Sequence, residues 1–125
     1  MANPNIVNVT SIYGKTTYLT PANTTANVLL ANAASSGKVL KINQIIAANV
    51  NGASAVDTTV VINSAASGSG TSYPVASTIA VPSDASLIVV DKTTAIYLEE
   101  DKSIVVTSGT SSGISYSISY EEIAS

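Results

Sequence analysis

The 125-residue sequence contains no cysteine, histidine, arginine, tryptophan or phenylalanine. Without cysteine and histidine the chain cannot form disulfides, carry out thiol or imidazole chemistry, or build the usual zinc sites. Five lysines and a net charge of -3 offer no basic patch that would neutralise phosphates, so we do not expect nucleic-acid binding. We therefore look for a function that needs few charges and none of the common catalytic side chains.

Targeting signals are also missing from the sequence. The first residues, MANPNIVNVTSIYG, lack the positively charged and apolar regions of a secretory signal. No apolar run approaches the roughly 18 residues that are needed to span a bilayer. We expect a soluble, intracellularly made protein without a membrane partner, and its length favours a single domain.

The residues that are present favour β-structure. Stretches rich in Val, Ile and Thr alternate with clusters of Gly, Ser, Asn and Asp at short spacing, which is typical of an all-β sandwich or barrel. We predict an antiparallel β-sandwich of the jelly-roll or immunoglobulin-like type with about eight or nine strands. The predicted strands are 16–20, 25–32, 38–49, 56–63, 75–81, 86–91, 94–98, 103–108 and 113–121.

Local patterns assign roles to several of these strands. In the last one, large residues at even positions alternate with Ser115, Ser117 and Ser119, so one face should be buried and the other wet. The large residues of that last strand are Ile114, Tyr116, Ile118 and Tyr120.

The strand 38–49 should be central in its sheet, with a bulge or bend near Asn43–Gln44.

Two further segments are marked by proline and glycine. Pro74 and Pro82 flank the strand 75–81 and cannot donate ladder hydrogen bonds, which predicts that this strand lies on an edge or ends at the two prolines. Ser67–Ser72, with the sequence SGSGTS, has no side chain large enough to pack and should be a mobile, exposed loop.

The first fifteen residues allow two interpretations. Residues 1–15 are either the first strand of the domain or an extended arm, with residues 16–125 forming the sandwich itself. An arm could add to the sheet of a neighbouring subunit through backbone hydrogen bonds. The apolar residues that would form this subunit interface are Ile6, Val7, Val9 and Ile12.

A search for catalytic residues finds no convincing set. Many serines are present, but nucleophilic serine needs a base, which is usually histidine. Ser35 precedes Lys38 by three residues, as in one Ser–Lys motif, yet the companion motifs are absent and the segment SSGK reads as a turn. We predict no catalytic, cofactor-binding or metal-binding residue.

The acidic segment IYLEEDKSIVV, residues 96–106, is the strongest candidate for a reactive site. Glu99, Glu100 and Asp101 could hold a calcium-type cation or, with exposed tyrosines, act on a sugar. No calcium-loop motif accompanies them. We favour a β-hairpin in which these acidic residues form the turn and their side chains are exposed to solvent. A cation site remains the alternative.

Three segments carry a resemblance to a known group of proteins. These are SSGKVLKINQIIAANVNG, VPSDASLIVVDKTTAIYLEEDKSIVV and the terminal SYEEI. Together they resemble small virion proteins of tailed bacteriophages, those of marine cyanophage-like genomes in particular. The resemblance implies a β-sandwich structural protein of the virion, assembled in the bacterial cytoplasm, with no enzymatic residues and no cofactor.

Within that class we expect a head decoration (cement) protein. Its partners would be the major capsid protein and copies of itself in a homo-oligomer, for which a trimer is one expected form. A tail, neck or fibre component is an alternative, as is a glycan- or receptor-binding module. Exposed tyrosines gathered at one loop end would favour that module, and the candidates are Tyr13, Tyr18, Tyr73 and Tyr97.

Overall fold

Nine β-strands make up the computed structural model, which describes residues 4–124. The predicted all-β antiparallel sandwich is confirmed, and all nine predicted strands are present. A short 3₁₀ turn, η1 (Lys92–Thr94), is the remaining regular element. The strands are β1 (Ser11–Leu19), β2 (Asn27–Asn32), β3 (Lys38–Asn49), β4 (Val56–Asn63), β5 (Ser72–Val81), β6 (Ser86–Val90), β7 (Ile96–Leu98), β8 (Lys102–Ser108) and β9 (Ile114–Ala124).

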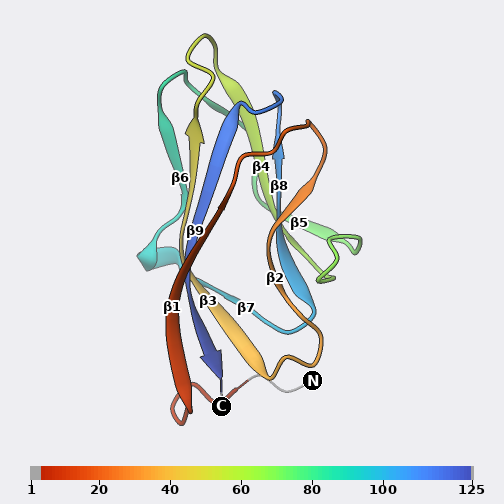
Figure 1. The fold of residues 1–125 in the computed structure, drawn as a ribbon, viewed down its shortest axis with the longest axis vertical. Helices are drawn as coiled ribbons and strands as arrows, with labels where there is room; N and C mark the ends of the chain where they lie inside the picture. Colours follow the sequence, from red (N-terminus) through yellow and green to blue (C-terminus); the bar gives the residue numbers. More distant parts are fainter. Residues whose placement is uncertain (1–3, 125) are drawn as a thin grey trace.

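The strands form two antiparallel sheets that pack face to face (Figure 1). Sheet A has the order β1-β9-β3-β6, with β7 also paired to β3, and sheet B has the order β2-β8-β4-β5. If β7 is set aside, the first strand pairs with the last, the second with the second last, and so on inward to β4 and β5. This nested pairing is the arrangement of a jelly roll rather than of an immunoglobulin-like sandwich.

The core lies between the two sheets and is built from Val, Ile and Leu. The alternation predicted for the last strand is confirmed from Ile114 to Ile118: Ile114, Tyr116 and Ile118 are fully buried, while the intervening serines are half-buried. Tyr120, predicted to lie on the same buried face, is only half-buried. Each such aliphatic side chain contributes about 1.5–3 kcal/mol when it is buried. The Tyr116 hydroxyl donates to the Thr107 carbonyl at 2.9 Å and also bonds to Thr58, so the polar end of this buried aromatic ring is satisfied.

A bulge in β3 sits where the sequence predicted a bend. The pairing with β9 passes from Ile42 directly to Gln44, so Asn43 is the extra residue. The bulge shifts the inward-facing positions by one, which explains why both Ile42 and Ile45 are fully buried although they are three residues apart.

The strand flanked by prolines is an edge strand, as predicted. β5 ends sheet B next to β4, and Pro74 lies inside it opposite Val61. The loop that precedes β5 is largely exposed, but the expectation that nothing in it packs is wrong. Gly68 lies so close to the outer face of sheet B that a Cβ there would be 2.9 Å from Val28 Cγ2 and 3.4 Å from Val105 Cγ2.

The predicted hairpin over residues 96–106 is also wrong. β7 pairs with β3 in sheet A, whereas β8 pairs with β2 and β4 in sheet B. The acidic turn between them therefore crosses from one sheet to the other at one end of the sandwich.

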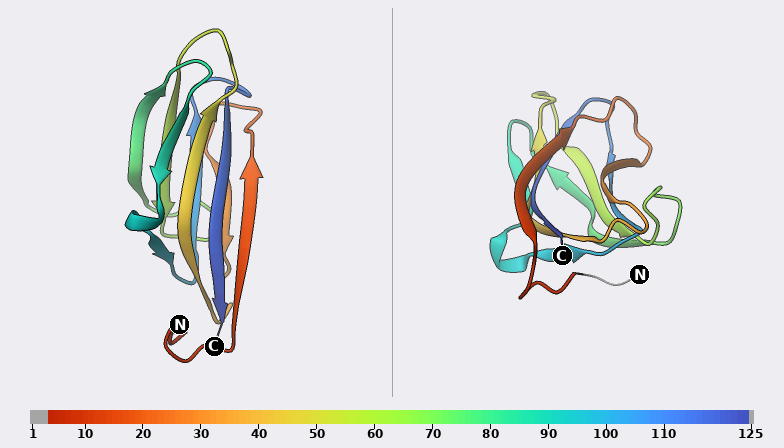
Figure 2. Two further views of the ribbon diagram at one scale, coloured as in Figure 1. Left: turned by 90° about the vertical axis from the view of Figure 1, so that its left-hand side faces the viewer. Right: turned by 60° about the horizontal axis from the view of Figure 1, so that its bottom comes forward.

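The segment before β1 lies at the lower end of the molecule, near the end of β9 (Figures 1 and 2). The Thr10 amide donates to the Ala124 carbonyl at 2.9 Å, and Pro4 is buried. Residues 11–15 belong to β1, so β1 starts five residues earlier than predicted. Within residues 4–124 no helix is long and apolar enough to cross a membrane.

Candidate functional site

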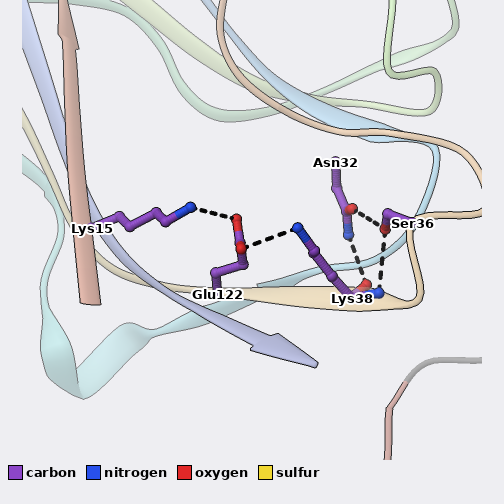
Figure 3. A network of polar contacts seen from close by, with 5 residues as sticks. All are labelled: Lys15, Asn32, Ser36, Lys38 and Glu122. Atoms are coloured by element: carbon purple, nitrogen blue, oxygen red, sulfur yellow. Dashed lines mark hydrogen bonds and ion pairs between the residues drawn. The ribbon is translucent and has the colours of Figure 1, made fainter. Parts of the chain in front are cut away.

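A polar network closes the lower end of the sandwich (Figure 3). At its centre is Glu122 on β9, whose carboxylate accepts hydrogen bonds from two ammonium groups. Lys15 on β1 donates to Oε2 at 3.0 Å, and Lys38 on β3 donates to Oε1 at 3.1 Å. Since β9 lies between β1 and β3, one carboxylate ties three adjacent strands together.

The network continues into the turn between β2 and β3. The buried Asn32 side chain donates to the carbonyls of Lys38 at 2.9 Å and Leu98 at 3.0 Å, and it accepts from Ser36 Oγ at 2.6 Å. Ser36 Oγ also accepts from the Lys38 amide at 3.2 Å. The turn itself bends through positive φ at Ser35 and Gly37.

The ionisation of Glu122 follows from these contacts. The hydrogen bond from Lys15 is the largest influence and holds the pKa of Glu122 below its ordinary value, with Lys38 acting in the same direction. The same bond raises the pKa of Lys15. Glu122 and Lys15 both stay charged near neutral pH, and the network fits a structural tie between three adjacent strands.

In the turn after β7, the side chains of Glu99, Glu100 and Asp101 lie in different surroundings. Glu99 lines a cavity on the outer side of sheet A, and Asp101 Oδ1 accepts from the Ala66 amide at 3.2 Å. Glu100 is only 7% exposed, and its Oε2 has no hydrogen-bond partner among the described residues. The prediction that all three acids turn in solvent is therefore wrong for Glu100.

No group of three or more acidic side chains that could hold a metal ion is found within residues 4–124. The turn residue Asp101 adopts a positive φ of 57°, which a short polar side chain tolerates. The divergence of the three carboxylates argues against the calcium-type alternative, because a hard cation needs several oxygens converging on one point.

One shallow cavity of about 320 Å³ lies where the N-terminal segment crosses the outer side of sheet A. Its lining is mainly apolar, and Glu99 is the one carboxylate in it. The lining residues are Pro4, Ile6, Val39, Tyr97 and Glu99.

The four residues predicted for a subunit interface occupy different environments. Val7 is 92% exposed, Ile6 and Ile12 are about half exposed, and Val9 is half-buried. Ile6 contributes to the cavity, while Ile12 lies in β1 opposite Ile123. The structure thus brings an exposed apolar group to the lower end of the sandwich.

The tyrosines that would mark a sugar platform do not gather at one loop end. Tyr13 and Tyr18 lie near opposite ends of β1 and on opposite faces, Tyr73 lies on β5 in the other sheet, and Tyr97 lies on β7. All four are exposed. Their scatter counts against the glycan-binding alternative.

Sequence reasoning missed the network around Glu122. The signal was present, because the period of two in the last strand places Glu122 on the same face as Ile118 and Tyr120. A carboxylate on an inward face requires a cationic partner, and Lys15 and Lys38 were available.

No protein-family model matches the sequence, and no curated protein matches it. Among solved structures, the chain is similar to one in the "Structure of infectious bursal disease virus Gt strain", with a TM-score of 0.42 and 10% sequence identity. The match covers 93% of this chain but 31% of that chain, so the protein spans about a third of the length of the chain that it matches. A likeness of this strength carries no argument about function.

Proposed function

We propose that this protein is a non-enzymatic structural component of a tailed-phage virion, and specifically a head decoration protein that bridges capsid subunits. Its partners are the major capsid protein and further copies of itself, and its location is the virion, which assembles in the bacterial cytoplasm. The proposal rests on the resemblance of three sequence segments to such virion proteins and on the character of the surface described next.

The observation that carries the proposal is the outer face of sheet A. Near its lower end this face holds Lys41 and Glu121, but elsewhere its strands present mostly Ser, Thr, Tyr and Ile. A weakly charged face with scattered large apolar groups suits burial against another protein, since charged residues are depleted at the centres of interfaces. Its exposed large residues are Ile12, Tyr18, Ile88 and Tyr97.

The exposed apolar residues at the lower end extend this surface. We propose that Ile6, Val7, Val9 and Ile12 contact a neighbouring subunit of the particle. Val7 supports the proposal best, because an aliphatic side chain that is almost fully exposed gains most when a partner covers it. Interfaces of roughly 1,000 Å² or more, repeated around a symmetry axis, would stabilise a capsid without any single strong contact.

Electron microscopy of purified virions that carry a labelled copy of this protein tests the location. Density at the capsid symmetry axes is the expected result. Density confined to the tail, neck or fibre would overturn the decoration role while leaving a virion role, and absence of the protein from purified particles would overturn both.

A pair of matched variants tests the contact surface. Val7→Lys places a charge at the lower end, and Val50→Lys places one on another exposed valine, in the loop after β3. We expect Val7→Lys to reduce the amount of protein that co-sediments with capsids at least tenfold, and Val50→Lys to bind as the parent does. Equal binding of both variants would contradict the assignment of Val7.

A further inference from the structure

Each sheet of the sandwich has two edges, and an unprotected edge strand pairs readily with another chain. Three of these four edges carry features that discourage such pairing. β2 is short and has a register shift between Val28 and Leu30. One edge of sheet A is shared by β6 and β7, which are shorter still, and β6 has a shift in its pairing with β3. β5 has two register shifts and contains Pro74. Bulges, short strands and proline are the usual protections of an edge.

The fourth edge strand, β1, has none of these features. Its register with β9 runs without interruption from Ser11 opposite Ala124 to Leu19 opposite Tyr116. Its one charged residue, Lys15, is bound to Glu122 within its own sheet at 3.0 Å. In Figure 2 (left), β1 stands at the side of sheet A beyond β9. A long, regular and proline-free edge is thus left open.

A glycine in the middle of β1 has no explanation among its described neighbours. The backbone at Gly14 does not have positive φ, and a Cβ added there would meet no atom of residues 4–124 within 4 Å. Glycine inside a strand costs about 0.5–1 kcal/mol relative to alanine, and it often marks the close approach of another group. Tyr18 lies on the same face of β1, four residues further on, and is 77% exposed.

We propose that β1 pairs in antiparallel fashion with β1 of a second copy of this chain, about a two-fold axis at Thr16. A two-fold axis through an antiparallel pair places one residue opposite itself. With Thr16 at the axis, Gly14 lies opposite Tyr18 of the partner subunit. An aromatic side chain across from an edge glycine covers the exposed backbone there. The ring of Tyr18 from one copy would therefore fill the open space at Gly14 of the other.

The neighbouring registers fit less well. An axis at Lys15 would place two ammonium groups directly opposite each other, which is destabilising. An axis at Thr17 would place Lys15 opposite the apolar Leu19 of the partner subunit. The register at Thr16 places Lys15 opposite a threonine and joins the two copies of sheet A into one continuous sheet.

This contact is separate from the proposed virion role. It follows from the geometry of β1 alone, and its test measures the isolated protein, so a failed dimer leaves the virion proposal standing. Conversely, absence from virions would leave the dimer untouched.

Disulfide crosslinking tests the register directly, because the chain has no native cysteine. Opposed residues in an antiparallel pair have Cβ atoms about 4.5–5.5 Å apart, close to the disulfide range. Thr16→Cys should therefore form a covalent dimer on mild oxidation. Gly14→Cys alone should not, since the two copies of residue 14 would be about 13 Å apart at the usual strand rise. A mixture of Gly14→Cys and Tyr18→Cys should form the mixed dimer.

Sedimentation of Gly14→Val supplies the second measurement. Valine fits the open space and has a higher strand propensity than glycine, so the thermal midpoint of the monomer should not fall, while the dissociation constant of the dimer should rise at least tenfold. The inference is overturned if the parent stays monomeric up to sub-millimolar concentration, if its mass grows beyond a dimer, if Gly14→Val dimerises like the parent, or if Gly14→Cys crosslinks alone as well as Thr16→Cys does.

Discussion

Glu122 accepts a hydrogen bond from a lysine on each neighbouring strand, and its side chain is only 17% exposed. The two lysines are much more exposed, at 46% and 41% of their side chains. Water therefore screens the lysine ends of both pairs, so each pair makes only a modest contribution to stability. The value of the cluster lies in joining three adjacent strands near their lower ends.

The lowered pKa of Glu122 predicts a stability that depends on pH. A carboxyl whose folded pKa lies below its unfolded value stabilises the fold above the ordinary pKa of 4.5, and this contribution is lost as the pH falls through the lowered value. Glu122→Gln should therefore reduce the free energy of unfolding by about 1 kcal/mol at neutral pH and by almost nothing in strong acid.

Urea denaturation of both proteins at a series of pH values measures this difference. Asp91 also has a lowered pKa, but it contributes equally to both proteins and cancels. Asp84→Asn, at an exposed carboxyl, is the matched control and should show no comparable loss. A difference between parent and Glu122→Gln that persists unchanged in strong acid would contradict the role of the carboxylate.

Unlike Glu122, which has two lysine partners, Glu100 has a buried carboxylate oxygen without a hydrogen-bond partner among the described residues. Burying a carboxylate oxygen without a hydrogen-bond partner costs more than burying a neutral amide in its place. Glu100→Gln should therefore raise the free energy of unfolding by about 1 kcal/mol, while Glu99→Gln and Asp101→Asn should leave the fold nearly intact. Thermal midpoints with and without calcium or a chelator are the measurement. A calcium-dependent midpoint that disappears in Glu100→Gln would show that these acids hold a cation after all.

At the scale of elements, the loop between β4 and β5 is held by specific contacts. Asn63 Oδ1 accepts from the Gly70 amide at 2.9 Å, and Ser103 Oγ donates to the Ala65 carbonyl at 2.7 Å. Gly68 then brings the backbone against two valines of sheet B. Composition alone suggested a loop without packing, because the contact is made by backbone and by a residue without a side chain.

Two glycine variants separate packing from backbone strain in this loop. Gly68 and Gly37 both have positive φ, at 81° and 69°, so alanine is strained at either position. Only at Gly68 would the new methyl group also collide with valine side chains, since no atom of the described residues lies within 4 Å of a Cβ at Gly37. We expect Gly68→Ala to cost about 1–3 kcal/mol more than Gly37→Ala, measured by chemical denaturation. Equal losses would show that the loop does not pack as described.

The elements themselves were largely predictable from sequence, but their partners were not. Period-two alternation located β9, and the flanking prolines identified β5 as an edge strand. The three residues between β7 and β8 suggested a hairpin, because so short a connection usually joins paired strands. Here the pairing is decided by contacts of β7 with β3 and of β8 with β2 and β4, which no local pattern encodes.

The same limit applies to the whole molecule. Strand patterns favoured a sandwich without choosing between its jelly-roll and immunoglobulin-like forms. That choice depends on the register of Ser11 with Ala124 and of the strands nested inside that pair. The polar network at the lower end was missed for a related reason, since its three charged residues come from β1, β3 and β9 and meet only once those strands are aligned.

The position of β9 has a consequence for how the protein is made. Of the nine strands, β9 is synthesised last, yet it lies between β1 and β3 rather than at the margin of its sheet. Until it emerges from the ribosome, β1 has no hydrogen-bonding neighbour and β3 is exposed along the side that β9 will cover. β3 can pair with β6 and β7 before that point, but β1 can join sheet A only when β9 is available.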